Sequence, residues 1–172
     1  MANKQALRDL QTRLAERLRT AKTQQRGRSW LAVECGTHGF LLPLGEAGEI
    51  FALAPILPVP HTHRWFQGVV NLRGRLHGVV DLAGFLGLQT AASGREQARL
   101  VGFNASLDLN CTLLVDRLCG LRNDDVLTPL PASDAPKPAF VGQRLRDADG
   151  KVWLELKLTE LAADEAFLKI VE

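Results

Sequence analysis

The chain has 172 residues, a formal net charge of +2 and a hydrophobic fraction of 46%. This length suits one domain, or two small subdomains that share a core, and it is enough to bury an apolar interior without disulfide or metal support. No apolar run reaches the roughly 20 residues that a membrane-spanning helix needs, and the charged N-terminus lacks a signal-peptide core, so we expect a cytoplasmic protein.

The first predicted element is a basic amphipathic helix, an N-terminal extension over residues 1–28. Its Leu and Ala residues recur at steps of three and four, and Gly27 is a natural stop. The extension has eight Lys and Arg against two acidic residues, a net charge of +6, which leaves −4 for the remainder. Its apolar stripe predicts docking on the domain or on another helix, and a partner-binding or membrane-surface helix is the alternative.

Beyond Gly27 the sequence changes from a helical to an alternating pattern, which predicts short β-strands in a barrel or sandwich. The expected strands are 30–35, 40–42, 49–53, 66–72, 75–80, 99–104, 110–115, 140–146 and 151–157. The loop-like stretch 89–97 marks the expected boundary between two barrel subdomains of a domain spanning 29–172, and 129–138 is a Pro-rich loop. Thr159 is expected to cap a closing helix through about Lys169.

A near repeat lies in the middle of the chain, where GVVNL at 68–72 returns as GVVDL at 78–82. Aliphatic residues line both copies and Arg73-Gly74-Arg75 separates them, so the repeat predicts a hairpin whose turn uses Gly74. The second copy ends differently from the first. Asp81 is a candidate cap for a short helix, 82–86, that Gly87 terminates.

Residues 49–88, EIFALAPILPVPHTHRWFQGVVNLRGRLHGVVDLAGFLGL, resemble the signature segment of the CheW-like chemotaxis coupling proteins. Residues 112–121 and 140–161 are similar to later segments of that family, so the resemblance covers roughly 29–170. It implies a mainly β fold of two intertwined, five-stranded SH3-like barrels, here with an N-terminal helix and a short C-terminal helix. The N-terminal helix and the chain length resemble the PilI group of the family.

The resemblance implies an adaptor with no catalysis and no cofactor. Family members couple the cytoplasmic tip of a methyl-accepting chemoreceptor to the regulatory domain of a CheA-like histidine kinase. The PilI group does so for type IV pili and twitching motility, which implies a PilJ-like receptor as partner. We therefore expect a scaffold at membrane receptor arrays that does not insert into the membrane and binds no nucleic acid. A flagellar chemotaxis CheW coupling protein is the alternative.

Positions that match the family's motifs are the candidate contact residues. The resemblance implies receptor contacts at Ala47, Glu49, Arg73, Thr112 and Leu121. It implies kinase contacts at Ile50, Phe51, Leu53 and Ala54. We expect Glu49 and Arg73 to form an ion pair that orders the 73–75 turn and contributes roughly 0–1 kcal/mol to stability. Any single apolar residue among these is more often core, so only a cluster on one surface would indicate an interface. Gly78 and Thr112 depart from the family's common Pro and Gly.

Two other classes of function compete with the adaptor. His61 and His63, with His77 and Asp81, come nearest to a metal site, but a Pro-flanked surface loop explains the first two better. The sequence has no P-loop, nucleophile elbow or dinucleotide fingerprint, so we expect neither an enzyme nor a metal site. A small-barrel nucleic-acid-binding module is the lower-ranked alternative. The N-terminal extension is basic, but the predicted β domain is net acidic and lacks aromatic residues interleaved with Lys and Arg.

Overall fold

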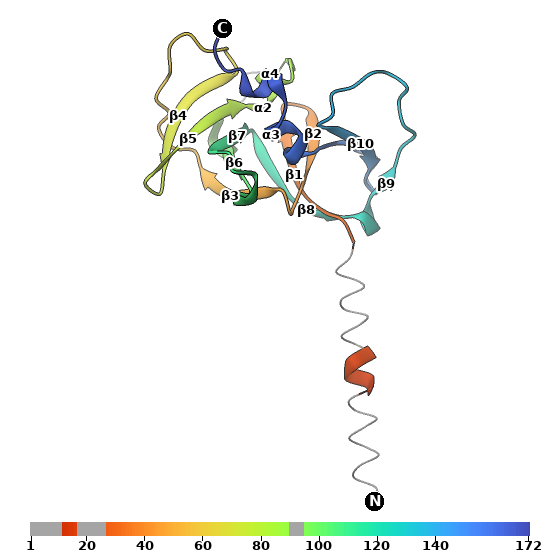
Figure 1. The fold of residues 1–172 in the computed structure, drawn as a ribbon. Coiled ribbons are helices and arrows are strands. Elements are labelled where there is room, and N and C mark those ends of the chain that lie inside the picture. Colours follow the sequence, from red (N-terminus) through yellow and green to blue (C-terminus); the bar gives the residue numbers. More distant parts are fainter. Residues whose placement is uncertain (1–11, 17–26, 90–94) are drawn as a thin grey trace, which may run out of the picture.

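A computed structural model describes residues 12–16, 27–89 and 95–172 (Figure 1). The predicted N-terminal helix lies outside these ranges except for residues 12–16, which are helical. The described chain from residue 29 onward is mainly β, with eleven strands in two sheets and a few short helices. The expectation of a mainly β fold is therefore confirmed.

The first sheet is built from both ends of the domain. Its six strands follow the order β8-β1-β2-β11-β10-β9. Their bounds are β1 Ser29–Cys35, β2 His38–Pro43, β8 Arg117–Asn123, β9 Thr128–Pro129, β10 Val141–Arg146 and β11 Val152–Leu156. Strand β11 pairs with β2 in parallel, and the other pairs are antiparallel. The parallel pair joins the C-terminal strands to the N-terminal hairpin.

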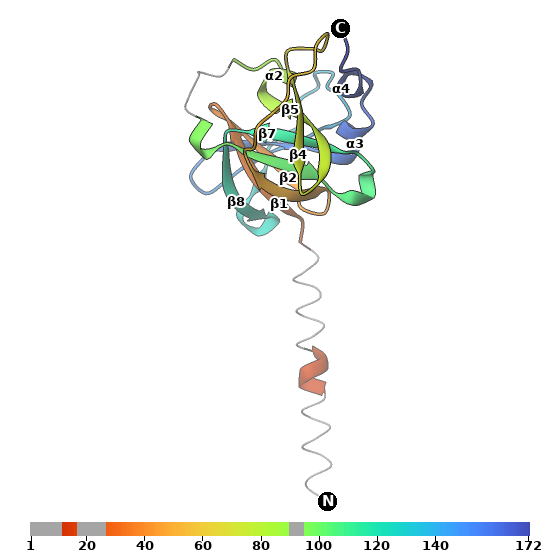
Figure 2. The same cartoon turned by 90° about the vertical axis from the view of Figure 1, so that its left-hand side faces the viewer.

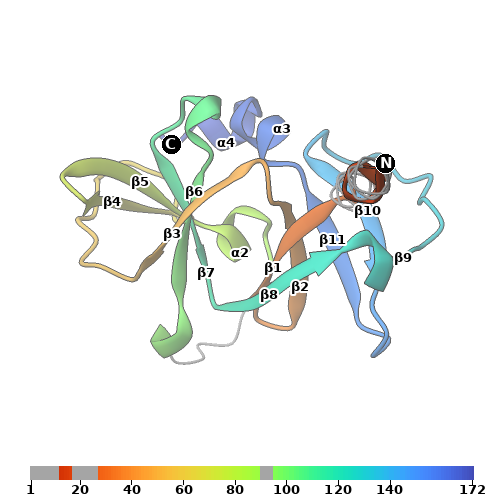
Figure 3. The ribbon, with the colours of Figure 1, turned by 90° about the horizontal axis from the view of Figure 1, so that it is seen from below.

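The second sheet comes from the middle of the chain and has the order β3-β6-β7-β5-β4. Its strands are β3 Ala47–Ala52, β4 Phe66–Leu72, β5 Arg75–Asp81, β6 Arg99–Phe103 and β7 Cys111–Val115. The segment 89–97, the expected subdomain boundary, connects β5 to β6 inside this sheet. The chain instead changes sheet after β2 and again after β7. Seen from below, the two sheets lie on opposite sides of α2 (Figure 3).

The helices of the domain are short and lie at the ends of strands. They are α2 Leu82–Phe85, α3 Leu158–Ala162 and α4 Glu165–Leu168. Helix α2 confirms the expected helix after the repeat, although the side chain of Asp81 makes no capping hydrogen bond. The expectation of one closing helix capped by Thr159 is wrong, because Lys157 is the N-cap of α3. Asp164 then accepts a hydrogen bond from the Phe167 backbone N–H at 3.0 Å and begins a separate helix.

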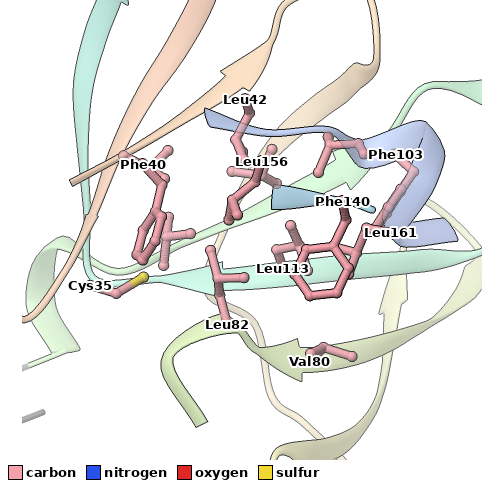
Figure 4. Packing of buried hydrophobic residues seen from close by; sticks show 14 of the residues in the cluster. Cys35, Phe40, Leu42, Val80, Leu82, Phe103, Leu113, Phe140, Leu156 and Leu161 are labelled. Atoms are coloured by element: carbon pink, nitrogen blue, oxygen red, sulfur yellow. The ribbon is translucent and has the colours of Figure 1, made fainter. Parts of the chain in front are cut away.

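A continuous apolar core fills the space between the sheets (Figure 4). Phe40 and Leu42 from the first sheet meet Val80 and Leu113 from the second, and Leu82 of α2 packs among them. Each sheet has a further small cluster, around Trp30 and Trp153 in the first and around Val70, Val79 and Leu100 in the second. Burial raises the pKa of Cys35 and Cys111 to about 12, so both side chains are neutral core thiols.

The near repeat forms the β4–β5 hairpin, which faces the viewer in Figure 2. Leu72 pairs with Arg75, so the loop has two residues, Arg73 with φ 51° and Gly74 with φ 81°. Two positive φ angles make this a type I′ turn, whose twist matches that of the strands. The side-chain oxygen of Asn71 accepts a hydrogen bond from the Gly74 N–H at 2.9 Å, so Asn71 helps to close the turn.

Replacing Gly74 with Ala is expected to lower the free energy of unfolding by about 1 kcal/mol, because a Cβ disfavours positive φ. No atom lies within 4 Å of the added Cβ, so the cost comes from the backbone and not from a clash. Gly45 is a matched control, since it has equal open space and no positive φ. Urea denaturation measures both, and equal losses in the two variants would contradict the turn assignment.

Candidate functional site

The candidate site is a cavity of about 510 Å³ between β3 and the tip of the β4–β5 hairpin. The pairings leave β3 and β4 as the two ends of the second sheet, so the sheet has an open seam there. In Figure 1 the tip of the β4–β5 hairpin and β3 both lie at the lower left of the domain. We call this space the seam cavity. It is lined by Gly48, Glu49, Phe51, Leu72, Arg73, Arg75, His77 and residues of the β6–β7 connection between Gly102 and Cys111.

The predicted ion pair crosses the seam. Arg73 Nη2 lies 2.5 Å from Glu49 Oε1, and the Arg73 guanidinium is 5.8 Å from the centre of the Phe51 ring. The two charged side chains are 76% and 45% exposed, so water screens the attraction and the pair adds little to stability. Its main consequence is positional, because it ties the hairpin tip to β3 and leaves a guanidinium and a carboxylate at the surface.

A bulge in β3 sets the position of Glu49. The β3–β6 register shifts between Ala47 and Ile50, and a Cβ at Gly48 would overlap the backbone of Phe103. Only glycine therefore allows this close approach of the two backbones. Ala47, at the start of the strand, is half-buried and packs against the central core.

Two of the implied receptor contacts lie away from the seam cavity. Thr112 in β7 has no exposed surface, and its hydroxyl donates to the Gly78 carbonyl oxygen at 3.2 Å. A direct contact with a partner is not open to Thr112 in this structure. Leu121 is 59% exposed, but it belongs to β8 in the other sheet. The five positions therefore do not form one continuous surface.

The implied kinase contacts divide by exposure. Ile50 and Leu53 are exposed at the free edge of the second sheet, at 39% and 37%. Phe51 and Ala54 are partly buried against the sheet's own apolar cluster. Phe51 also lies under the Arg73 guanidinium in the wall of the seam cavity. It therefore groups with Glu49 and Arg73 rather than with Ile50.

The sequence reasoning did not find Arg75 and His77 as members of the cavity wall. Their i, i+2 spacing in a strand was the available signal, because it puts both side chains on one face. The His77 ring lies 6.2 Å from the Phe51 ring, centre to centre. Its Nδ1 is buried and has no hydrogen-bond partner among the described residues.

His61 and His63, the other two histidines considered as metal ligands, make contacts within the protein. His63 stacks on Trp65 with 5.3 Å between ring centres, and the His61 carbonyl accepts a hydrogen bond from the Glu172 backbone. Across 12–16, 27–89 and 95–172, no cluster of three or more His, Cys, Asp or Glu side chains is arranged to hold a metal. Within the same ranges no helix is long and apolar enough to cross a membrane.

The remaining buried charges lie in the first sheet and are satisfied within the protein. Burial raises the pKa of Glu34, but hydrogen bonds from Lys151 and Arg117 outweigh this, and the net pKa is lowered. Glu155, 2% exposed, pairs with Arg28 and accepts a 2.9 Å hydrogen bond from the Trp30 indole. These contacts link strands of the sheet and give both carboxylates partners within the protein.

The chain is similar to known proteins both in sequence and in fold. The family model described as "CheW-like domain" matches residues 29–166. Protein PilI of Pseudomonas aeruginosa is 31% identical over 153 residues, which cover 86% of this chain and 83% of that protein. Chemotaxis protein CheW of Thermotoga maritima is 35% identical over 91 residues, 53% of this chain and 58% of the other. The crystal structure of the scaffolding protein TtCheW from Thermoanaerobacter tengcongensis has a similar fold, with a TM-score of 0.61 at 19% identity over 77% of this chain and 90% of that one.

Proposed function

The chain belongs to the CheW-like family, and from this we propose that it is a non-catalytic adaptor that couples a methyl-accepting chemoreceptor to a CheA-like histidine kinase. The PilI relative covers most of the chain, which supports the chemosensory pathway of type IV pili and twitching motility. Flagellar chemotaxis is the alternative, because shorter matches carry the CheW name. We further propose that the protein works in the cytoplasm, at the receptor arrays.

One observation on β3 carries this proposal. Glu49 and Phe51 face the seam cavity, whereas Ile50 between them is exposed on the opposite face of the strand. An adaptor needs two surfaces that different partners can occupy together. Strand β3, the end strand of its sheet, offers both, a polar cavity wall on the face with Glu49 and Phe51 and an exposed apolar side chain, Ile50, on the opposite face. We assign the seam to the receptor and the edge around Ile50 and Leu53 to the kinase.

A binding titration of the purified chain against a CheA-like regulatory domain and a receptor tip tests the proposal. We expect Ile50→Asp to weaken kinase binding about tenfold or more, because a carboxylate would be desolvated in an apolar contact. Receptor binding should stay within twofold, or roughly 0.4 kcal/mol. Val152→Asp is the matched control, since Val152 is a strand residue of similar exposure, 37%, in the other sheet.

Two results would contradict the two parts of the assignment. If the wild-type chain binds neither partner, the adaptor function is wrong. If Ile50→Asp binds the kinase domain as well as Val152→Asp does, the edge of β3 is not the kinase surface. Comparing the kinases of the pilus and flagellar pathways in the same titration separates the two pathways, and we expect tighter binding to the pilus kinase.

A further inference from the structure

We propose that the seam cavity receives one acidic side chain of the docked receptor, with Arg75 and His77 as its binding partners. This inference rests on the proposed function and adds the chemistry of the contact. It does not depend on the Glu49–Arg73 pair, which already neutralises itself. It depends on two groups of the cavity wall, Arg75 and His77, that have no partner among the described residues.

The first of these groups is the Arg75 guanidinium. Arg75 and Arg73 flank Gly74 at the hairpin tip, but only Arg73 has a carboxylate partner. No acidic oxygen lies within 4 Å of Arg75 in the described part of the chain, and its side chain lines the cavity. A guanidinium presents a planar fork of donors that matches a carboxylate. Arg75 is therefore a positive group that the fold itself leaves unpaired.

The second group is His77, two residues along β5 on the same face. Its buried Nδ1 lacks a partner among the described residues, and buried polar atoms are normally hydrogen-bonded. When Nδ1 carries the proton it needs an acceptor, and a carboxylate held by Arg75 supplies one once the imidazole turns its buried Nδ1 toward the cavity. The Phe51 ring, in the same cavity wall, has its centre 6.2 Å from that of the imidazole. One incoming group would thus satisfy both wall residues.

The rest of the wall selects the kind of ligand. Leu72, Phe103 and Leu109 give the cavity an apolar part, which suits the methylene stem of an acidic side chain. Asp108 also faces the cavity, is exposed, and would repel a second negative charge. A phosphate, with its higher charge, fits this wall less well than a single carboxylate does. We therefore assign the cavity to a Glu or Asp of the protein partner.

The test compares receptor-tip binding by Arg75→Gln and His77→Leu with binding by the wild-type chain. We expect each variant to weaken binding about tenfold, while the affinity for the kinase regulatory domain stays unchanged. Arg144→Gln is the control, since Arg144 is another exposed strand arginine with no ion pair among the described residues. Arg75 is exposed, so its variant should fold even if His77→Leu is less stable. Wild-type affinity for the receptor tip in Arg75→Gln would overturn the inference.

Two further measurements identify the ligand. Each acidic residue of the receptor tip is changed to its amide, and one of them should show strong non-additivity with Arg75→Gln in a double-mutant cycle. The ¹⁵N signal of His77 Nδ1 should shift when the receptor tip is added. An equal shift with inorganic phosphate or glutarate alone would mean a small-anion site and overturn the inference. If the wild-type chain itself does not bind the receptor tip, by contrast, the adaptor function is wrong.

Discussion

Replacing Glu155 with Ala is expected to lower the free energy of unfolding by about 3 kcal/mol. Glu155 is 2% exposed, lies in β11 and accepts hydrogen bonds from three donors. They are the Trp30 indole at 2.9 Å, the Gln143 backbone N–H at 3.3 Å and the Arg28 guanidinium. Removing the carboxylate leaves the buried Trp30 indole N–H and the part-buried Gln143 N–H unpaired, and each unpaired buried donor costs about 1–3 kcal/mol. It also leaves a void beside Trp30.

Two further variants separate hydrogen bonding from charge. Glu155→Gln keeps an acceptor for the Trp30 indole but loses the ion pair with Arg28, whose side chain is 54% exposed and therefore screened. We expect it to lose about 1 kcal/mol, which is less than Ala loses. Glu160→Ala is the control, because Glu160 is exposed in α3. Urea unfolding followed by tryptophan fluorescence measures all three. A loss for Glu155→Ala no larger than for Glu160→Ala would contradict the structural role of the network.

The strands that the sequence predicted are those with a clear local pattern. The β4–β5 hairpin is the best case, because its repeated aliphatic residues and Gly74 define both strands and the turn. Strand β8 was missed, since its residues are mostly exposed, Gly120 has φ 83°, and its register with β1 shifts in the middle. Strand β9 is only two residues long and ends at Pro129, so it is too short to show an alternating pattern of apolar and polar residues.

The candidate site was only partly predictable. The Glu49–Arg73 pair followed from the family resemblance, and the structure contains it. The cavity behind it is assembled from β3, the hairpin tip and the β6–β7 connection, which are separated by many residues in the chain. No local pattern brings such segments together. The complete burial of Thr112 was hidden for a related reason, because β7 lies at the centre of its sheet and is buried on both faces.

Changing Arg73 to Glu is expected to weaken receptor-tip binding about tenfold or more. The variant puts one carboxylate on each side of the seam, and their repulsion loosens the hairpin tip from β3. It also reverses the charge that position 73 offers to the partner. Backbone strain is unaltered, because Arg and Glu have the same cost at φ 51°. The free energy of unfolding should change by no more than about 1 kcal/mol, since the pair is exposed. Arg146→Glu is the control, because Arg146 is an exposed arginine at the end of β10, in the other sheet.

The double variant Glu49→Arg/Arg73→Glu distinguishes the two ways in which the pair can act. It restores an ion pair across the seam but reverses the direction in which the charges are presented to the partner. If the pair only positions the hairpin tip, receptor binding should return to the wild-type value. We expect it to remain at least about fivefold weaker, because a partner that contacts Arg73 directly would meet a carboxylate instead. Full recovery would show that the pair positions the turn without touching the receptor, and the direct contact would then have to come from other residues of the seam.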